Sequence, residues 1–326
     1  MPAPSQPSPT KSRIVRIGTR ASKLALAQAG MMQRAIAAAL GAPPEDAERV
    51  APLIHITTTG DRVQDRRLLE IGGKALFTKE IEEALLDGRI DCAVHSLKDM
   101  PAELPPGLVI GAIPEREDPR DVFVSRLAAS VDTLPQGASL GTASLRRQAQ
   151  ALHRRPDLKI VNLRGNVDTR LAKLEAGEAA AIIQALAGHL RLGLTGLPAT
   201  AVDPVEFPPA PGQGALAIEV REAYAAAPWL TALIHHPTTL TVAAERGALA
   251  ALEGSCKTAI GAHATLSGTR LSLIVEALTP DGARRFREIG ETEVGGGAGE
   301  AAARALGLRL GEAVGRAGGP ALMLQG

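Results

Sequence analysis

Apolar, strand-like segments alternate with capped helical segments twice along the first two thirds of the chain, and this alternation constrains the fold most. In the first series, strands are predicted over 13–18, 52–58 and 90–94, and helices over 23–40 and 79–87. In the second series, strands are predicted over 121–124, 158–163 and 180–183, and helices over 144–154 and 166–177. Strand–helix–strand alternation favours a mostly parallel sheet flanked by helices. Two such series predict two α/β lobes with a cleft between them.

The pattern changes near residue 238, after a stretch rich in proline and glycine. Residues 207–214 first stiffen and then turn the chain, which is typical of a crossover between lobes. Beyond them, helices over 241–252 and 299–315 and apolar strands near 259–266, 270–277 and 286–294 predict a smaller α+β domain. We therefore expect a disordered tail over 1–12, lobe 1 over 13–114 and 214–232, lobe 2 over 115–213, and a C-terminal domain over 238–326.

The composition argues against several classes of partner. The chain has 326 residues and a formal net charge of +1. A chain this close to neutral has no global basic field to attract nucleic acid or an anionic membrane, so we expect neither partner. The Pro- and Ser-rich N-terminal residues lack the apolar region of a signal peptide, and no apolar run reaches membrane-spanning length. These features predict a cytoplasmic protein, and the spacing of Cys and His residues predicts no metal site.

Arginine side chains gather at the turns where strands lead into helices. They are Arg20, Arg146, Arg147, Arg164 and Arg170, with Arg191 after a later helix. Any one of them is most simply a solvated charge on a helix face. The repeated position instead favours convergence on one cleft, where guanidinium forks and free helix N–H groups bind anions. The set therefore indicates a ligand that carries several carboxylates.

Asp99 and Lys98 follow the apolar strand 90–94, just before Pro101 halts regular structure. A strand end that opens into a loop is where α/β proteins usually place their chemistry. The two residues could form a surface ion pair without a role in catalysis. Alternatively, Asp99 could be a buried or half-buried carboxylate that stabilises a developing cation and handles protons. Position alone leaves both interpretations open.

The two cysteines occupy different settings. Cys92 lies within an apolar strand and is predicted to be a small core side chain. Cys256 lies among small residues and precedes Lys257, which would help to stabilise a thiolate. It is either an incidental loop thiol or a reactive group, since no local motif pairs it with a histidine. Separately, Gly72-Gly73-Lys74 precedes Phe77 and a helix, and this run predicts a hinge or lid.

Taken together, these segments resemble the porphobilinogen deaminase family from about residue 16 to residue 264. The matching motifs occur in a single order along the chain: Arg16-Ile17-Gly18-Thr19-Arg20, Gly72-Gly73-Lys74-Ala75-Leu76-Phe77, His95-Ser96-Leu97-Lys98-Asp99-Met100-Pro101, Gly141-Thr142-Ala143-Ser144-Leu145-Arg146-Arg147-Gln148, Asn162-Leu163-Arg164-Gly165-Asn166-Val167, Pro211-Gly212-Gln213-Gly214-Ala215 and Leu252-Glu253-Gly254-Ser255-Cys256.

The resemblance implies a fold and a reaction. The two lobes would adopt the α/β fold of type II periplasmic binding proteins, and a small C-terminal α+β domain would carry a dipyrromethane cofactor, held by a thioether to Cys256. The family condenses four porphobilinogen molecules head to tail on this primer and releases ammonia and hydroxymethylbilane. It implies a monomer whose product passes to uroporphyrinogen-III synthase.

The resemblance also assigns roles to single residues. Asp99 matches the catalytic aspartate, and Lys74 and Phe77 match a mobile loop over the cleft. The residues implied in holding the cofactor are Cys256, Lys98, Ser96, Arg20, Thr142, Ser144, Arg146, Arg147 and Arg170. Those implied in holding substrate are Arg20, Ser22, Arg164, Arg170, Arg191 and Gln213.

The chain also departs from the family pattern. Ser255, Lys257 and Ala259 alter the cysteine loop, and Gln184 and His189 interrupt a segment that is usually more apolar. A different class of function remains compatible with the lobes and arginines alone: a non-catalytic module of the same two-lobe fold that binds a carboxylate ligand. Such a module would need neither Asp99 nor a modified Cys256.

Overall fold

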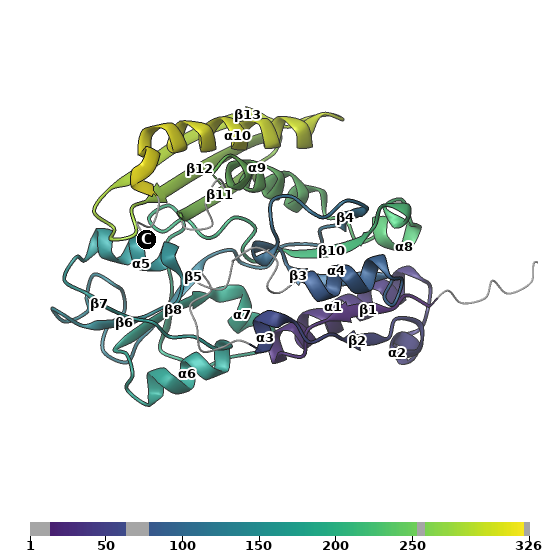
Figure 1. Cartoon of the computed structure of the whole chain (residues 1–326), viewed down its shortest axis with the longest axis horizontal. Helices are drawn as coiled ribbons and strands as arrows, with labels where there is room; N and C mark the ends of the chain where they lie inside the picture. Colours follow the sequence, from purple (N-terminus) through teal and green to yellow (C-terminus); the bar gives the residue numbers. More distant parts are fainter. Residues whose placement is uncertain (1–13, 63–77, 253–257, 323–326) are drawn as a thin grey trace, which may run out of the picture.

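The computed structural model describes residues 14–62, 78–252 and 258–322. The predicted tail over 1–12 and the residues Lys74, Phe77 and Cys256 lie outside this range. Figure 1 shows two α/β lobes side by side, with the C-terminal helices and strands lying across both of them. Each of the three parts is organised around its own sheet in the described chain.

The first sheet has the strand order β2-β1-β3-β10-β4. Its strands are β1 (Ile17–Thr19), β2 (Leu53–His55), β3 (Cys92–Ser96), β4 (Leu108–Ala112) and β10 (Leu216–Arg221). Its helices are α1 (Lys23–Ala39), α2 (Ala47–Val50), α3 (Thr59–Arg62), α4 (Lys79–Leu86) and α8 (Pro228–Thr231). The hydroxyl of Ser22 caps α1 by accepting a hydrogen bond from the backbone N–H of Ala25 at 3.3 Å.

The second sheet repeats this arrangement with the order β7-β6-β8-β5-β9. Its strands are β5 (Asp121–Val124), β6 (Ser139–Gly141), β7 (Lys159–Val161), β8 (Ala181–Ala185) and β9 (Ala199–Ala201). Its helices are α5 (Leu145–Arg154), α6 (Val167–Glu175) and α7 (Leu186–Arg191). In each sheet four strands run in the same direction, and one strand, β10 or β5, is antiparallel to both of its neighbours.

The chain passes between the two sheets twice. After β4 it crosses to β5 of the second sheet, and after β9 it returns to β10, which lies between β3 and β4. The return segment includes residues 207–214, where the sequence predicted a crossover. Two matching sheets that each receive one antiparallel strand from a crossing segment constitute the type II periplasmic-binding-protein-like fold, so this prediction is confirmed.

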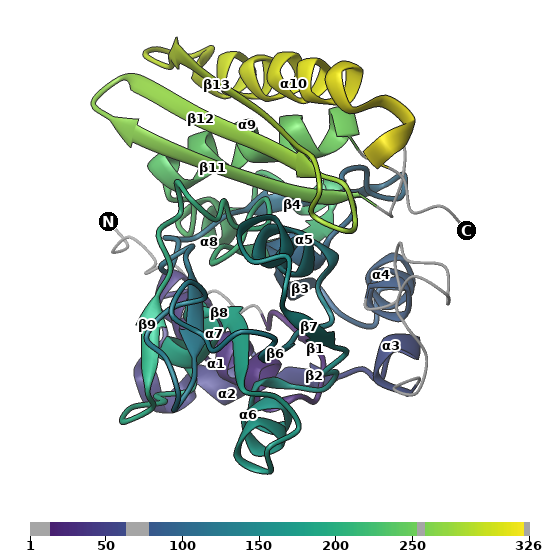
Figure 2. The same ribbon diagram turned by 90° about the vertical axis from the view of Figure 1, so that its left-hand side faces the viewer.

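The C-terminal part consists of α9 (His236–Leu252), β11 (Ala259–Ser267), β12 (Arg270–Leu278), β13 (Arg285–Glu293) and α10 (Gly299–Gly318). The three strands form an antiparallel sheet, and α9 and α10 pack together against it (Figure 2). Close approach of these helices requires glycine, because a Cβ on Gly307 would lie 2.0 Å from the carbonyl oxygen of Ala244. This is the predicted small α+β domain, although α9 begins five residues before the predicted start.

One buried carboxylate joins this domain to both crossing segments. Glu245 of α9 is fully buried and accepts two hydrogen bonds of 2.8 Å from the guanidinium of Arg116. It also accepts from the backbone N–H groups of Gly212 and Ala264 at 2.7 and 2.9 Å. The buried charge is thus paired and hydrogen-bonded, as it must be to offset its desolvation. These bonds fix the segments that connect the lobes, and thereby the floor of the cleft between them.

Candidate active site

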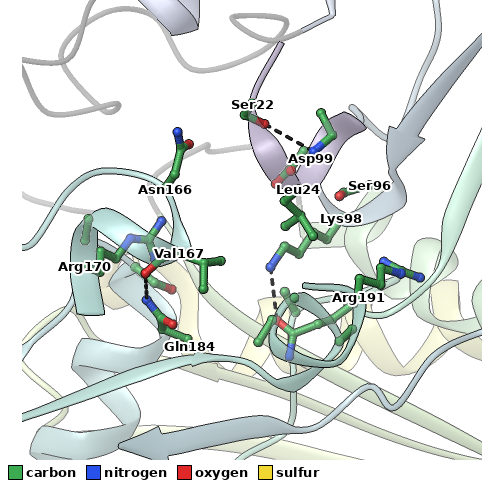
Figure 3. A pocket seen from close by; sticks show the side chains of 18 of the residues that line it. Ser22, Leu24, Ser96, Lys98, Asp99, Asn166, Val167, Arg170, Gln184 and Arg191 are labelled. Carbon is green, nitrogen blue, oxygen red and sulfur yellow. Dashed lines mark hydrogen bonds between the residues drawn. The ribbon is translucent and has the colours of Figure 1, made fainter. Parts of the chain in front are cut away.

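A cleft of about 500 Å³ lies between the two lobes. Side chains from the carboxyl ends of parallel strands in both sheets line it, which is where open α/β sheets bind their ligands. Figure 3 shows Arg170, Asn166 and Gln184 of lobe 2 facing Ser22, Asp99 and Lys98 of lobe 1. Within the described chain, seven cationic side chains and one carboxylate line the cleft: Arg20, Lys98, Arg146, Arg147, Arg164, Arg170, Arg191 and Asp99.

Asp99 ends a short 3-10 turn, Leu97–Asp99, that directly follows β3. It is exposed to the cleft, so the expectation of a buried or half-buried carboxylate is wrong in its burial. The alternative of an ion pair with Lys98 is not found either, since no such contact occurs between these two described residues. Ser96, at the end of β3, exchanges hydrogen bonds with the amide of Gln28 at 3.0 and 3.2 Å. The carboxylate therefore faces the cleft with its oxygens available to a ligand.

Lys98 points across the cleft floor toward Gln213, whose side-chain oxygen lies 3.5 Å from its Nζ (Figure 3). Burial and then the positive charge of Arg147 lower the pKa of Lys98 to about 8, against the opposing effect of Asp99. The ammonium lacks an anion close enough to offset its burial. A carboxylate ligand would supply that anion.

The N-terminal turn of α5 forms part of the lobe 2 wall. The Ser144 hydroxyl caps this helix by accepting from the Arg147 backbone N–H at 3.5 Å, and the Thr142 hydroxyl accepts from the Ser144 N–H at 3.1 Å. Ser144 lines the cleft, whereas Thr142 is buried behind it. The two hydroxyls therefore shape a helix terminus whose dipole favours anions.

Arg146 and Arg147 are held from behind by Asp121 of β5, which is fully buried. Its two oxygens accept from Arg146 Nη1 at 2.7 Å, Arg147 Nη2 at 2.8 Å and Gln213 Nε2 at 2.9 Å. Burial alone would raise the pKa of this carboxyl, but the two guanidiniums outweigh it and hold the pKa well below its usual range. One charged aspartate thus orients two arginines without neutralising both.

Two further arginines of the positive lining donate hydrogen bonds to backbone carbonyl oxygens. Arg170 donates from Nε to the carbonyl of Gly165 at 2.8 Å, and burial, reinforced by Arg147, lowers its pKa to about 10. Arg191 donates from Nη2 to the carbonyl of Gly214 at 2.6 Å, and burial lowers its pKa despite the charge of Glu117. Neither bond neutralises the guanidinium, because a carbonyl oxygen carries only a partial charge.

Several guanidinium nitrogens in this wall are buried without an acceptor. Among the described residues, Arg146 Nε, Arg164 Nη1 and Arg191 Nε have no hydrogen-bond partner. Buried donors are normally satisfied, and leaving a charged one unsatisfied is costly. The three arginines that carry these nitrogens line the cleft, so the charges present fit an anionic cofactor such as dipyrromethane.

The cleft brings together most of the residues that the sequence singled out. Every predicted arginine lines it, as do Ser22, Ser96, Lys98, Asp99, Ser144 and Gln213. Sequence reasoning missed Asp121 as a partner of the arginines, and gave Gln184 no role in the cleft. In the described chain, no group of three or more His, Cys, Asp or Glu side chains could hold a metal ion, and no helix is long and apolar enough to span a membrane.

Comparisons with known proteins agree on one family. The family model described as porphobilinogen deaminase, dipyromethane cofactor binding domain, matches residues 15–227, and that of the porphobilinogen deaminase C-terminal domain matches residues 239–315. A porphobilinogen deaminase of Phenylobacterium zucineum (strain HLK1) is 66% identical over 98% of this chain and 100% of its own length.

Further relatives and structures extend this picture. A porphobilinogen deaminase of Caulobacter vibrioides (strain NA1000 / CB15N) is 66% identical over 95% of this chain and 98% of its own. Among solved structures, substrate binding domain 2 of Lactococcus lactis GlnP in the open conformation has a TM-score of 0.41 and 14% identity, over 76% of this chain and 93% of that one. The TM-score and the identity are too low for this structure to add to the topology described above.

Proposed function

This chain belongs to the porphobilinogen deaminase family, and we propose that the inter-lobe cleft carries out the family's reaction through the residue roles given below. The enzyme is a transferase that condenses four porphobilinogen molecules head to tail on a dipyrromethane primer, with release of ammonia and hydroxymethylbilane, in tetrapyrrole biosynthesis. One observation carries the assignment of roles: seven cationic side chains converge on a cleft whose described lining contains one carboxylate, Asp99.

The cationic side chains hold the acetate and propionate groups that each pyrrole ring carries. Guanidinium groups suit this task because their planar forks match carboxylates and they stay charged at neutral pH. In this proposal the substrate is held by Arg20, Ser22, Arg164, Arg170, Arg191 and Gln213. The cofactor is held by Ser96, Lys98, Arg20, Ser144, Arg146, Arg147 and Arg170, while Thr142, which is buried behind the cleft, supports the turn at Ser144. When bound, the dipyrromethane supplies the nucleophilic pyrrole carbon for the first condensation.

Asp99 is the catalytic residue of the proposal. Loss of ammonia leaves a cation on the incoming pyrrole ring, and a carboxylate positioned in advance stabilises such a charge without reorganisation. Asp99 is suited to this role because it faces the cleft and forms no ion pair with Lys98. Its oxygens can accept hydrogen bonds from pyrrole N–H groups, which orients the ring as well as stabilising it.

Cys256 is the proposed attachment point of the cofactor. It lies outside the described residues, but the strand that begins at Ala259 is placed against the cleft wall: Ala259 packs on Leu145 and Ala149 of α5. The first turn of that helix carries Arg146 and Arg147 into the cleft. The described strand that follows Cys256 in the sequence therefore packs against the helix whose N-terminal turn favours anions.

Membership of the family also supports proposals on the domain limits, the oligomeric state, the location and the fate of the product. We propose the domain limits expected from the sequence, 13–114 with 214–232, 115–213 and 238–326, each enclosing one of the three sheets. We also propose that the protein acts as a monomer in the cytoplasm. Because the linear product must be cyclised, it would pass to uroporphyrinogen-III synthase. The non-catalytic binding module is not favoured, since relatives 66% identical over nearly the whole chain are porphobilinogen deaminases.

The test is the intact mass of the purified protein under denaturing conditions. The proposal expects a mass excess equal to one dipyrromethane, which is lost in Cys256→Ser. Cys92→Ser is the matched control, because Cys92 is buried in lobe 1 and should leave the excess unchanged. An unmodified chain, still bare after incubation with porphobilinogen, would contradict the attachment at Cys256.

A further inference from the structure

Two polar side chains are buried together in the wall of lobe 2, in a segment whose other residues are apolar or glycine. Gln184 lies on β8 and is 2% exposed, and His189 lies on α7 and is 3% exposed. His189 Nε2 lies 2.6 Å from Gln184 Oε1. Gln184 also lines the cleft, beside Arg170 and Val167 (Figure 3). Burying the Gln184 amide costs free energy, because its polar atoms lose contact with water, whereas an apolar side chain would fill the same space without this cost. The presence of the amide therefore needs a physical explanation.

The contact with His189 fixes the orientation of the Gln184 amide. An amide oxygen can only accept, so His189 donates from Nε2 and the Gln184 amino group must point the other way. Burial, reinforced by the charge of Arg147, lowers the pKa of His189, which keeps the ring neutral at physiological pH. The two residues therefore present an N–H₂ group, rather than a carbonyl, on the cleft side.

That amino group is only weakly engaged within the protein. Its one contact in the described chain is with the carbonyl oxygen of Val167, at 3.4 Å, which is long for a hydrogen bond (Figure 3). The amide thus has one N–H without a described acceptor and another in a weak bond. Such a donor can turn to a ligand at little cost.

We propose that Gln184 is a further substrate-contacting residue, which donates a hydrogen bond from Nε2 to a carboxylate of a pyrrole unit, and that His189 is its positioning residue. The inference rests on the proposed function of the cleft. A neutral donor is suited to this part of the wall, because another cation would be repelled by Arg147, whose charge already contributes to lowering the pKa values of Arg170 and His189. The Gln184 amide would also select a ligand by the position of its carboxylate rather than by charge alone, since a hydrogen bond from an amide to a carboxylate is directional.

The test uses the purified holoenzyme and a pyrrole that carries the acetate and propionate groups but no aminomethyl group. This probe binds without being deaminated, so isothermal titration calorimetry measures affinity independently of turnover. Gln184→Leu removes the donor, and Gln184→Glu removes it while keeping an acceptor for His189, so that this variant retains the buried contact. Gln148→Leu is the matched control, because Gln148 donates to the Pro280 carbonyl at 3.2 Å and does not line the cleft.

A hydrogen bond to a charged acceptor is typically worth enough to change affinity by about 10-fold or more. We expect both Gln184 variants to weaken probe binding by about this factor and to raise KM for porphobilinogen with little change in kcat, because the contact is made equally before and during reaction. We expect His189→Leu to show a smaller loss, and His189→Gln, which retains an N–H donor, to restore part of it.

Affinity for the probe within about twofold of the parent protein in Gln184→Glu, with the fold intact, would overturn the inference. So would an equal loss in Gln148→Leu. Failure of the proposed function is a separate outcome: the parent protein itself would neither bind the probe nor consume porphobilinogen. A parent that does both, with unaffected Gln184 variants, would refute only the role of Gln184.

Discussion

Replacement of Asp121 by asparagine should destabilise the protein strongly although it changes only one side-chain atom. Asp121 is fully buried and accepts from Arg146, Arg147 and Gln213 at 2.7–2.9 Å. Asparagine would retain one acceptor but turn an N–H₂ group toward two buried guanidiniums. Breaking a buried ion pair in this way typically costs about 3–5 kcal/mol, because the remaining charges are left without compensation.

The assay is thermal unfolding followed by far-ultraviolet circular dichroism, with urea unfolding to obtain the free energy. A loss of this size corresponds to a fall in Tm on the order of 5–15 °C for a protein of this length. Asp132→Asn is the matched control, since Asp132 is 48% exposed and its ion pair with Arg154 is at the surface. Exposed pairs contribute about 0–1 kcal/mol, so its Tm should barely change.

The lowered pKa of Asp121 also predicts how the stability of the protein changes with pH. The pKa of Asp121 is lowered in the folded state, so its contribution to stability is complete above the unfolded pKa of about 4 and is lost as pH falls toward the folded value. The difference in unfolding free energy between the parent protein and Asp121→Asn should therefore shrink on acidification below about pH 4. A difference below about 1 kcal/mol at neutral pH would refute the reasoning, because the arginines would then not depend on this carboxylate.

Three further outcomes are expected. Asp99→Asn should nearly abolish condensation while leaving Tm unchanged, because the side chain is exposed in the cleft; near-normal turnover would exclude its catalytic role. KM for porphobilinogen should rise above pH about 8 as Lys98 loses its charge, and a rise that persists in Lys98→Met would assign it to another group. Gly307→Val should lower Tm by several degrees, since its Cβ would meet the Ala244 carbonyl at 2.0 Å, whereas an unchanged Tm would mean that the helices separate freely.

The sequence predicted the parallel core of each lobe but not all of its strands. Long capped helices such as α1 and apolar strands such as β3 carry strong local signals, and both were found where expected. Strands β4, β6 and β9 were missed. Strands β6 and β9 are short and lie in segments without the apolar run that indicated the equally short β7, whereas β4 was missed although Leu108–Ala112 is apolar. Strand β10 was missed because Glu219 interrupts its apolar pattern; tertiary pairing with His95 at 2.9 Å makes that buried carboxylate acceptable.

The sequence identified most of the residues that line the cleft, but it did not identify the side chains with which they form ion pairs and hydrogen bonds. The repeated placement of five arginines at strand-to-helix turns indicated that they converge on one cleft, and Arg191, at the end of α7, lines the same cleft. The ion pairs of Arg146 and Arg147 with Asp121 could not be predicted, because the arginines lie on α5 and the aspartate on β5, and only the folded lobe brings these two elements together. The Gln184–His189 contact has the same origin, since it depends on how α7 packs back on β8.

The strand exchange between the sheets has a consequence for biosynthesis. β10 lies between β3 and β4, yet it is the last strand of that sheet to leave the ribosome, about a hundred residues after β4. Until residue 221 emerges, β3 and β4 have no shared neighbour, and their facing edges can pair with other chains. Lobe 2 can complete its own sheet first, since β5 to β9 are contiguous in the chain. The nascent protein should therefore close its second lobe before its first.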